Sequence, residues 1–170
     1  VKLIISTNTA WNLINFRAGL IKALVARGYE VLALAPEDEY AVQLDTLGCR
    51  FVPLPMDNNG THLGRDFLLT VRFFMLMRAE RPDVYLGYTI KPNVYGSLAA
   101  HALQIPVINN IAGLGTVFSK GGLLNRLVRC LYRISLSRSA KVFFQNQDDR
   151  QLFVSGGLVS ETVTDILPGS

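Results

Sequence analysis

The sequence has 170 residues, of which 49% are hydrophobic, so it can bury one sizeable core and is expected to form a single domain. The formal net charge of +4 hides an asymmetry, because residues 84–147 contain Lys and Arg but no Asp or Glu. No alternation of aromatic and basic residues of the kind that stacks bases accompanies this charge, which argues against a nucleic-acid partner.

Apolar segments of strand length alternate with segments of helical periodicity along the whole chain. In chain order we expect a strand at 2–6, a helix at 12–27, a strand at 30–35, a helix at 40–47, a strand at 50–54, a helix at 65–81, a strand at 83–87, a helix at 93–103, a strand at 107–111, a helix at 122–137, a strand at 141–145, a helix at 147–155 and a strand at 163–167. Apolar strands that alternate with helices are typical of a parallel sheet covered on both faces. The sequence therefore predicts an α/β fold with a Rossmann-like, doubly wound parallel sheet.

Cysteine usage and hydropathy indicate the cellular compartment. Cys49 and Cys130 lie far apart without metal-ligand spacing, and we expect both to be reduced core residues. No segment reaches the roughly 18 apolar residues of a membrane span, and no basic leader with an apolar run begins the chain. A cytoplasmic location is expected.

The Pro168-Gly169 pair follows the last expected strand. Such pairs are typical of the turns between secondary-structure elements, which predicts that a longer protein continues beyond it.

The loop after the first strand excludes several uses of this architecture. Residues 6–12 lack the G-x-G-x-x-G pattern that lets a backbone approach a dinucleotide pyrophosphate. A P-loop and the clustered acids of a receiver domain are also absent. The loop instead offers amides, an indole and a cation, which suit sugar hydroxyls and diphosphates. These candidate ligand-binding residues are Asn8, Trp11, Asn15 and Arg17. The alternative is that Thr9 or Asn12 only caps a helix and the indole only packs.

Two further junctions between strand and helix lie in the acid-free segment, at 88–96 and 109–116. Such junctions bind ligands in open α/β sheets, and a positive field there favours a phosphate-bearing ligand or an anionic membrane surface. The alternatives are a solvated basic face, a solvated helix cap and a tight glycine turn. The candidate residues are Thr89, Lys91, Asn93, Gly113, Leu114, Gly115 and Thr116. His62 and Asp66 are weaker candidates for a general base, since a lone His in a polar loop is usually just exposed.

Three segments carry a resemblance to a known family. They are Leu24-Val25-Ala26-Arg27-Gly28-Tyr29-Glu30-Val31, Tyr88-Thr89-Ile90-Lys91-Pro92-Asn93-Val94-Tyr95-Gly96 and Ile111-Ala112-Gly113-Leu114-Gly115. Together and in this order they resemble the N-terminal lobe of the GT-B glycosyltransferases of family 4. The resemblance covers essentially all 170 residues. The branch it indicates adds sugars to polyprenyl-diphosphate-linked intermediates of bacterial surface polysaccharides and N-glycans.

The resemblance implies that the enzyme has two lobes, one for the acceptor and one for the donor. Residues 1–170 would be the N-terminal, acceptor-side lobe, and a donor-binding lobe with an E-x7-E motif would lie outside this chain. The enzyme would transfer a hexosyl or N-acetylhexosaminyl group from a nucleotide-sugar, expected to be a UDP-sugar, with retention and without metal or cofactor. Its acceptor would be a lipid-linked saccharide of capsule, lipopolysaccharide or glycan biosynthesis. The resemblance assigns no catalytic residue to this chain.

Two departures from the family pattern limit what can be carried over. Ala112 stands where many relatives carry a His before the glycine, and the loop at 10–12 lacks the Gly-Gly pair that many relatives place near the donor phosphates. The alternative functions are a nucleotide-sugar epimerase of the same two-lobed architecture and a stand-alone Rossmann-like binding domain.

The helices expected at 65–81 and 122–137 intersperse arginines among apolar residues. Basic amphipathic helices can lie in an anionic membrane interface, which predicts peripheral association with the cytoplasmic face of the bacterial inner membrane. Packing against the sheet explains their apolar sides equally well.

Overall fold

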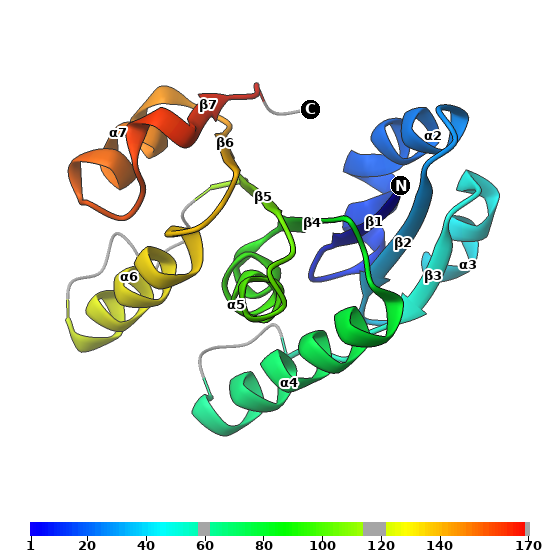
Figure 1. Cartoon of the computed structure of the whole chain (residues 1–170), viewed down its shortest axis with the longest axis horizontal. Helices are drawn as coiled ribbons and strands as arrows, with labels where there is room; N and C mark the ends of the chain where they lie inside the picture. The colour runs from blue at the N-terminus through cyan, green and yellow to red at the C-terminus, as the bar shows by residue number, and fades with distance from the viewer. Residues whose placement is uncertain (58–61, 114–121, 169–170) are drawn as a thin grey trace.

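The computed structural model describes residues 1–57, 62–113 and 122–168. Its centre is one sheet of seven parallel strands in the order β3-β2-β1-β4-β5-β6-β7 (Figure 1). The strands are β1 (Lys2–Ser6), β2 (Glu30–Ala35), β3 (Arg50–Pro53), β4 (Val84–Tyr88), β5 (Val107–Ile111), β6 (Lys141–Phe144) and β7 (Thr164–Ile166). The order reverses between β1 and β4, as in a Rossmann-like sheet, so the predicted fold class is confirmed.

Helices connect every pair of consecutive strands. The α-helices are α1 (Ala10–Asn12), α2 (Ala18–Ala26), α3 (Ala41–Leu44), α4 (Leu63–Glu80), α5 (Ser97–Ala102), α6 (Leu123–Leu136) and α7 (Gln147–Ser155). Short helical segments extend four connections: the π-helical turns η1 (Leu13–Arg17) and η3 (Pro92–Gly96), and the 3-10 turns η2 (Asp45–Leu47) and η4 (Glu161–Val163). Helix α5 contacts both α4 and α6 and lies between them (Figure 1).

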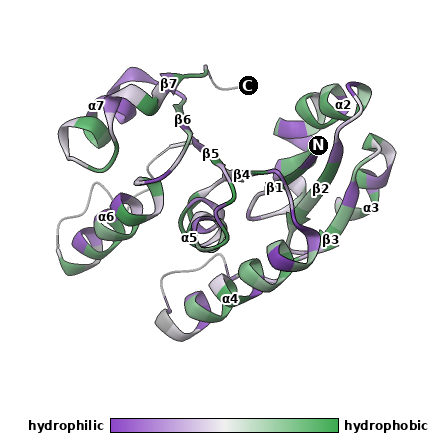
Figure 2. Cartoon of the chain, viewed as in Figure 1, coloured by the Kyte–Doolittle hydropathy of each residue, from purple (hydrophilic) through white to green (hydrophobic). Residues whose placement is uncertain are grey.

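The core has two parts, one on each face of the sheet. One part joins α1, η1, α2 and α3 to the sheet, with Leu13, Ile21 and Leu44 among its fully buried members. The other joins α4, α5, α6 and α7 to the opposite face, through residues such as Phe73 and Tyr132. In Figure 2, β1 is mostly hydrophobic in colour, whereas β5 includes hydrophilic residues. This burial on both faces is why the strands have continuous apolar runs in the sequence.

Most predicted elements are present, with shifted ends. The first helical segment begins at Ala10, two residues earlier than expected, because the Thr9 hydroxyl accepts a hydrogen bond from the Asn12 amide at 3.1 Å and caps it there. The last strand shortens to Thr164–Ile166, because the 3-10 turn η4 occupies the residues before it. The prediction that Cys49 is a core residue is confirmed. The same prediction for Cys130 was wrong, because this residue lies on the outward face of α6 and is exposed.

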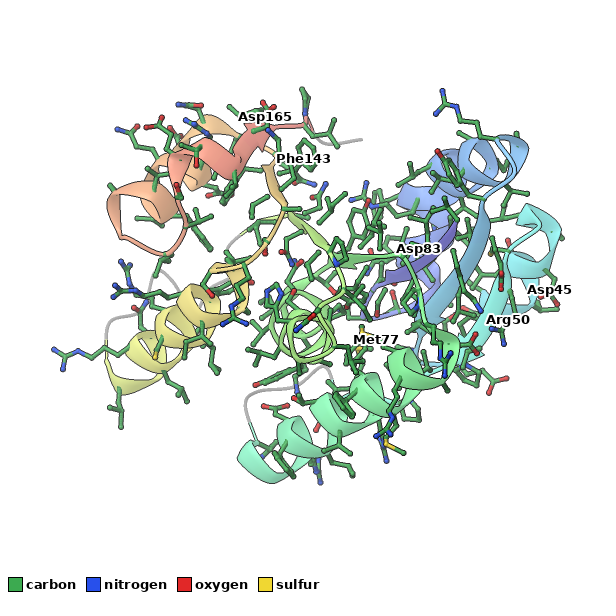
Figure 3. The ribbon with its side chains drawn as sticks, in the orientation of Figure 1. Asp45, Arg50, Met77, Asp83, Phe143 and Asp165 are labelled. Carbon is green, nitrogen blue, oxygen red and sulfur yellow. The ribbon has the colours of Figure 1, made fainter. Side chains whose placement is uncertain are left out.

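An ion-pair cluster fastens the last turn of α4 to the amino-terminal edge of the sheet. The Glu80 carboxylate accepts hydrogen bonds from Arg50 on β3 and from the Lys2 ammonium on β1, the latter at 2.7 Å (Figure 3, where Arg50 is labelled). Lys2 also pairs with Glu30 on β2 at 3.1 Å. The hydrogen bonds from Arg50 and Lys2 lower the pKa of Glu80 to about 2. The cluster therefore ties the first three strands of the chain to α4.

This depressed pKa predicts an acid-sensitive contribution to stability. Because the folded-state pKa of Glu80 lies below its ordinary value of 4.5, the contribution is present above that value and is lost as the pH falls toward about 2. We expect Glu80→Gln to unfold at a lower urea concentration than the wild type at pH 6. The difference between the two should shrink at pH 2.5. An equal difference at both pH values would contradict the assignment.

Candidate functional site

Two adjoining cavities lie where the strand order reverses, outside the carboxyl ends of β1, β4 and β5. The first, termed the Lys91 cavity, has a volume of about 260 Å³ and is lined by Asn8, Thr89, Ile90, Lys91, Asn93, Ile111, Ala112, Gly113 and Tyr132. The second, termed the Arg17 cavity, has a volume of about 310 Å³ and is lined by Thr7, Asn12, Phe16, Arg17, Tyr88, Thr89, Ala112 and Gln145. Thr89 and Ala112 line both, so the cavities share a wall. This place in the sheet is where open α/β folds bind ligands.

A π-helical turn follows each of the two strands at the reversal point. The turn η1 follows β1 and contributes Phe16 and Arg17 to the lining of the Arg17 cavity. The turn η3 follows β4 and contributes Asn93 to the lining of the Lys91 cavity. Such turns are rare and are often found at functional sites, because the extra residue changes the direction of the side chains that follow. Helical periodicity in the sequence does not reveal them.

Lys91 forms a buried ion pair across the first cavity wall. Its ammonium donates to Asp66 Oδ1 at 2.7 Å, and the two residues are 9% and 3% exposed. Asp66 Oδ2 accepts from the Tyr95 hydroxyl at 2.9 Å and from the His62 amide at 3.1 Å, at the start of α4. Burial and this contact with Asp66 raise the pKa of Tyr95, which keeps its hydroxyl a donor. Asp66 therefore balances the charge of Lys91 and joins α4 to η3.

Arg17 has different surroundings. Its guanidinium stacks over the Tyr88 ring with 4.3 Å between Cζ and the ring centroid, and its Nη1 donates to the Phe16 carbonyl at 3.3 Å. Among the described residues, no carboxylate lies within 4.0 Å of it. Burial lowers the pKa of Arg17, yet a guanidinium stays charged at neutral pH. The second cavity thus contains a cation whose charge no acidic side chain of the described chain offsets.

A buried network of polar side chains supports the wall between β5 and η3. Asn109 Nδ2 donates to Asn93 Oδ1 and to Ser97 Oγ, both at 2.9 Å, and Asn109 Oδ1 accepts from Ser139 Oγ at 2.6 Å. Asn93 Nδ2 in turn donates to the Asn110 carbonyl at 2.9 Å. Asn93 is therefore held by both of its amide atoms, so its position at the cavity is fixed by the fold.

The backbone at the shared wall adopts conformations that few residues accept. Thr89 has a φ of 64°, which is strained for a β-branched side chain and is the type of conformation that clusters at ligand sites. Gly113 has a φ of 93° at the end of the first cavity, and a Cβ there would meet no atom of the described residues within 4 Å. Glycine at 113 is thus required by the backbone conformation and not by crowding within the fold.

The structure brings together six of the residues proposed from the sequence. Asn8, Thr89, Lys91, Asn93 and Gly113 line the first cavity and Arg17 lines the second. Trp11 and Asn15 line neither: Trp11 is 41% exposed and packs edge-to-face on Phe16, and Asn15 donates to the Trp11 carbonyl at 2.9 Å. Leu114, Gly115 and Thr116 lie outside the described residues. The proposed roles of all these residues in ligand binding remain predictions.

Sequence reasoning missed several lining residues. Tyr132 belongs to α6 and Gln145 follows β6, and both reach the site only because β6 lies beside β5 in the sheet. Asn12, which the sequence offered either as a ligand-binding amide or as a helix cap, lines the second cavity. The position of Gln145 directly after an apolar strand was the one usable signal, since polar residues at strand ends gather at this edge.

In the described ranges, no set of three or more His, Cys, Asp and Glu side chains is arranged to hold a metal ion. Over the same ranges, no helix combines the length and the apolar character that membrane crossing requires.

A family model described as "Glycosyl transferase 4-like domain" matches residues 15–169. The chain belongs to this glycosyltransferase family. A curated relative from Campylobacter jejuni, N,N'-diacetylbacillosaminyl-diphospho-undecaprenol alpha-1,3-N-acetylgalactosaminyltransferase, is 28% identical over 152 residues. This match covers 85% of the chain and 40% of the relative, so the chain spans less than half the length of that protein.

Solved structures share the fold of this glycosyltransferase domain. The UDP-GlcNAc 2-epimerase of Neisseria meningitidis bound to UDP-GlcNAc superposes with a TM-score of 0.67 at 20% identity, over 98% of this chain and 46% of that one. MurG of Acinetobacter baumannii superposes with a TM-score of 0.63 at 15% identity, over 100% of this chain and 46% of that one. Both likenesses concern the fold alone.

The amide network predicts a large stability effect at Asn109. We expect Asn109→Ala to lower the free energy of unfolding by roughly 3 kcal/mol, because it removes three hydrogen bonds and leaves buried polar groups unpaired at about 1–3 kcal/mol each. Urea denaturation measures this loss. Gln43→Ala on the exposed side of α3 is the control and should change stability by less than about 0.5 kcal/mol. A similar small change for both variants would contradict the role of the network.

Proposed function

We propose that this domain is the acceptor-side lobe of a glycosyltransferase. The enzyme transfers one sugar from a nucleotide-sugar to a polyprenyl-diphosphate-linked saccharide, with retention of anomeric configuration, during assembly of a bacterial surface polysaccharide or glycan. The family match to residues 15–169 supports glycosyl transfer. The Campylobacter jejuni relative is named as an N-acetylgalactosaminyltransferase that acts on a diphospho-undecaprenol-linked sugar, which supports a lipid-linked acceptor and an N-acetylhexosaminyl donor group.

The observation that carries the proposal is the pair of adjoining cavities at the strand reversal point. Both cavities open at the carboxyl edge of the sheet, where a second lobe carrying the nucleotide-sugar would face them. Their linings combine hydroxyls and amides with Arg17 and Lys91, which suits a ligand with both a sugar and a diphosphate. No residue of this chain is assigned as the catalytic base.

The reaction breaks the bond between the anomeric carbon and the leaving nucleoside diphosphate and forms a bond from that carbon to an acceptor hydroxyl. The hydroxyl proton leaves with the released diphosphate or with solvent. Because negative charge develops on the leaving diphosphate, fixed cations and polar groups near it lower the barrier. The residues of this lobe hold and orient the acceptor in the cleft, while the donor is held chiefly by the second lobe.

A nucleotide-sugar epimerase is the second candidate. Its support is the likeness in fold to solved UDP-GlcNAc 2-epimerases, including the Neisseria meningitidis protein. The two functions differ in their products. An epimerase converts the nucleotide-sugar alone, whereas a transferase consumes it only when an acceptor is present.

A transfer assay on the full-length protein tests the proposal. We expect the lipid-linked saccharide to gain the mass of one sugar when incubated with a UDP-sugar, and we expect the isolated chain of 170 residues to transfer none. Gly113→Val should lower transfer, because Gly113 lines the Lys91 cavity and an added side chain would crowd a ligand there. A β-branched residue is strained at a φ of 93°, so the melting temperature is measured beside the transfer rate, and a large fall in it would assign the glycine to the fold instead. Epimerisation of the nucleotide-sugar without acceptor would establish the second candidate instead. Turnover by the isolated chain would contradict the division between lobes.

We also propose that helix α6 contacts an anionic membrane surface. One side of α6 buries Val128, Tyr132 and Leu136 against the sheet. A second apolar stripe faces outward at helical spacing and consists of Leu123, Leu127, Cys130 and Ile134, with Leu123 84% exposed. Packing on the sheet explains the first stripe and leaves the second unaccounted for.

Basic residues flank the outward stripe of α6. Arg126 and Arg133 are exposed beside it, and the helix alternates hydrophobic and hydrophilic segments along its length in Figure 2. The outward side of α4 has the same composition, with exposed Phe67, Val71 and Met75 near Arg72. An apolar strip flanked by cations matches the interface of an anionic bilayer, where the lipid-linked acceptor would reside.

Vesicle sedimentation tests the membrane proposal. We expect the full-length protein to bind vesicles that contain phosphatidylglycerol and to be released as salt rises, because the Debye length falls from about 10 Å at 0.1 M to about 3 Å at 1 M. Replacing Arg126 and Arg133 together by Ser should weaken binding severalfold. The matched control replaces the exposed Lys22 and Arg27 of the opposite layer by Ser and should bind nearly as well as wild type. Equal binding to neutral phosphatidylcholine vesicles at every salt concentration would contradict the proposal.

A further inference from the structure

The two cavities differ in how their cations are balanced. In the Lys91 cavity the ammonium is already paired with the Asp66 carboxylate at 2.7 Å, so the pair has no net charge. In the Arg17 cavity the guanidinium touches an aromatic ring and a backbone carbonyl, and no carboxylate of the described chain lies within ion-pair distance. The Lys91 cavity thus presents a neutral polar surface, and the neighbouring Arg17 cavity presents a positive one.

Both cavities contain donors that have no partner among the described residues. Arg17 has five N–H groups, and within the described part of the chain it makes one hydrogen bond, to the Phe16 carbonyl at 3.3 Å. Gln145 lies in the same cavity, and its amide makes no hydrogen bond to any described residue. Lys91 has three N–H groups and, among the residues that the structure describes, one hydrogen bond, to Asp66, so two of its donors have no described partner beside the Lys91 cavity. Each cavity can therefore bind oxygen atoms of a ligand.

A second ion pair lies in a neighbouring cavity that Lys91 also borders. Lys91 also borders a third cavity of about 630 Å³ beside α4, where Arg65 forms an ion pair with Asp57 at 2.7 Å. Lys91 and Arg65 are thus balanced, whereas Arg72 in the same cavity donates to the Pro55 carbonyl at 3.2 Å and, like Arg17, has no described carboxylate within 4.0 Å. A phosphate group is favoured by an unbalanced cation, because hydrogen bonds between ionised groups are the stronger ones, whereas sugar hydroxyls suit groups that donate and accept hydrogen bonds.

We propose that the Arg17 cavity binds a phosphate of a glycosyl diphosphate and that the Lys91 cavity binds the uncharged sugar attached to it. This inference rests on the proposed function and deepens it, by dividing one ligand between two sites. The shared wall at Thr89 and Ala112 makes the division possible, because a sugar and the phosphate bonded to it must occupy adjacent spaces. The Lys91 and Asp66 pair offers the sugar a donor, and Asn8 and Asn93 lie beside it.

Calorimetric titration of the full-length protein with inorganic pyrophosphate tests the assignment of the phosphate. We expect Arg17→Gln to weaken pyrophosphate binding about tenfold or more, because it removes a charge-assisted contact. Arg17→Lys, which keeps the charge and loses the planar fork, should retain part of the affinity and most of its dependence on salt. The double variant Lys91→Gln with Asp66→Asn replaces the ion pair by neutral side chains of similar size. It should bind pyrophosphate within about twofold of wild type if its melting temperature is preserved.

The opposite pattern would overturn the assignment. Unchanged pyrophosphate affinity in folded Arg17→Gln, or a larger loss in the double variant than in Arg17→Gln, places the phosphate elsewhere. These titrations need no sugar transfer, so they give a result even if the proposed transferase activity is not found. Should the double variant unfold, Lys91→Arg keeps the ion pair and the charge and serves in its place, with the same expected affinity for pyrophosphate.

Steady-state kinetics identify which glycosyl diphosphate is bound. Nucleotide-sugars and lipid-linked saccharides both contain this chemistry, so KM is measured for each with Arg17→Gln. A rise of about tenfold in KM for the lipid-linked saccharide alone assigns the site to the acceptor, and a rise for the nucleotide-sugar alone assigns it to the donor. The double variant should raise KM or lower kcat for the same substrate. Unchanged KM for both substrates in Arg17→Gln would overturn the inference.

Discussion

The reversal of strand order between β1 and β4 is the constraint on which the site depends. The sheet grows from β1 toward β3 on one side and from β4 toward β7 on the other, so the helices that follow β1 and β4 cover opposite faces. Their first turns diverge and leave a crevice at the carboxyl edge. Arg17 enters this crevice from the layer of one face and Lys91 from the layer of the other, so their separate environments follow from the topology.

The layer that contains α4, α5 and α6 is unusual in the polar groups it buries. Asn93, Ser97 and Asn109 have almost no solvent exposure, yet each has hydrogen-bond partners within the layer. Fully paired networks of this kind define a single arrangement, because any displacement leaves a buried group without a partner. The first cavity is therefore bounded by side chains whose positions are set by the core. A rigid wall of this type reduces the entropy that is lost when a ligand binds.

Local sequence features predicted the sheet well because β1 and β2 are buried along nearly their whole length and have continuous apolar runs. The six candidate residues that line the cavities were found because strand ends converge in a parallel sheet. The partner of Lys91 was not predictable, since Asp66 lies 25 residues earlier and reaches it only through the packing of α4. The π-helical turns were likewise hidden, because one extra residue in a turn leaves no mark on the hydrophobic period. Trp11 and Asn15 line neither cavity, and their proposed roles in ligand binding remain predictions.

The two cysteines differ in exposure, so a thiol reagent can label the outward face of α6 selectively. Cys49 is buried, whereas Cys130 is exposed among the leucines of the outward stripe. A thiol reagent would therefore react with the native chain first at this position, without any engineered residue. A polarity-sensitive dye attached there would sit at the centre of the stripe and report by its emission whether that side of the helix is in water or in hydrocarbon.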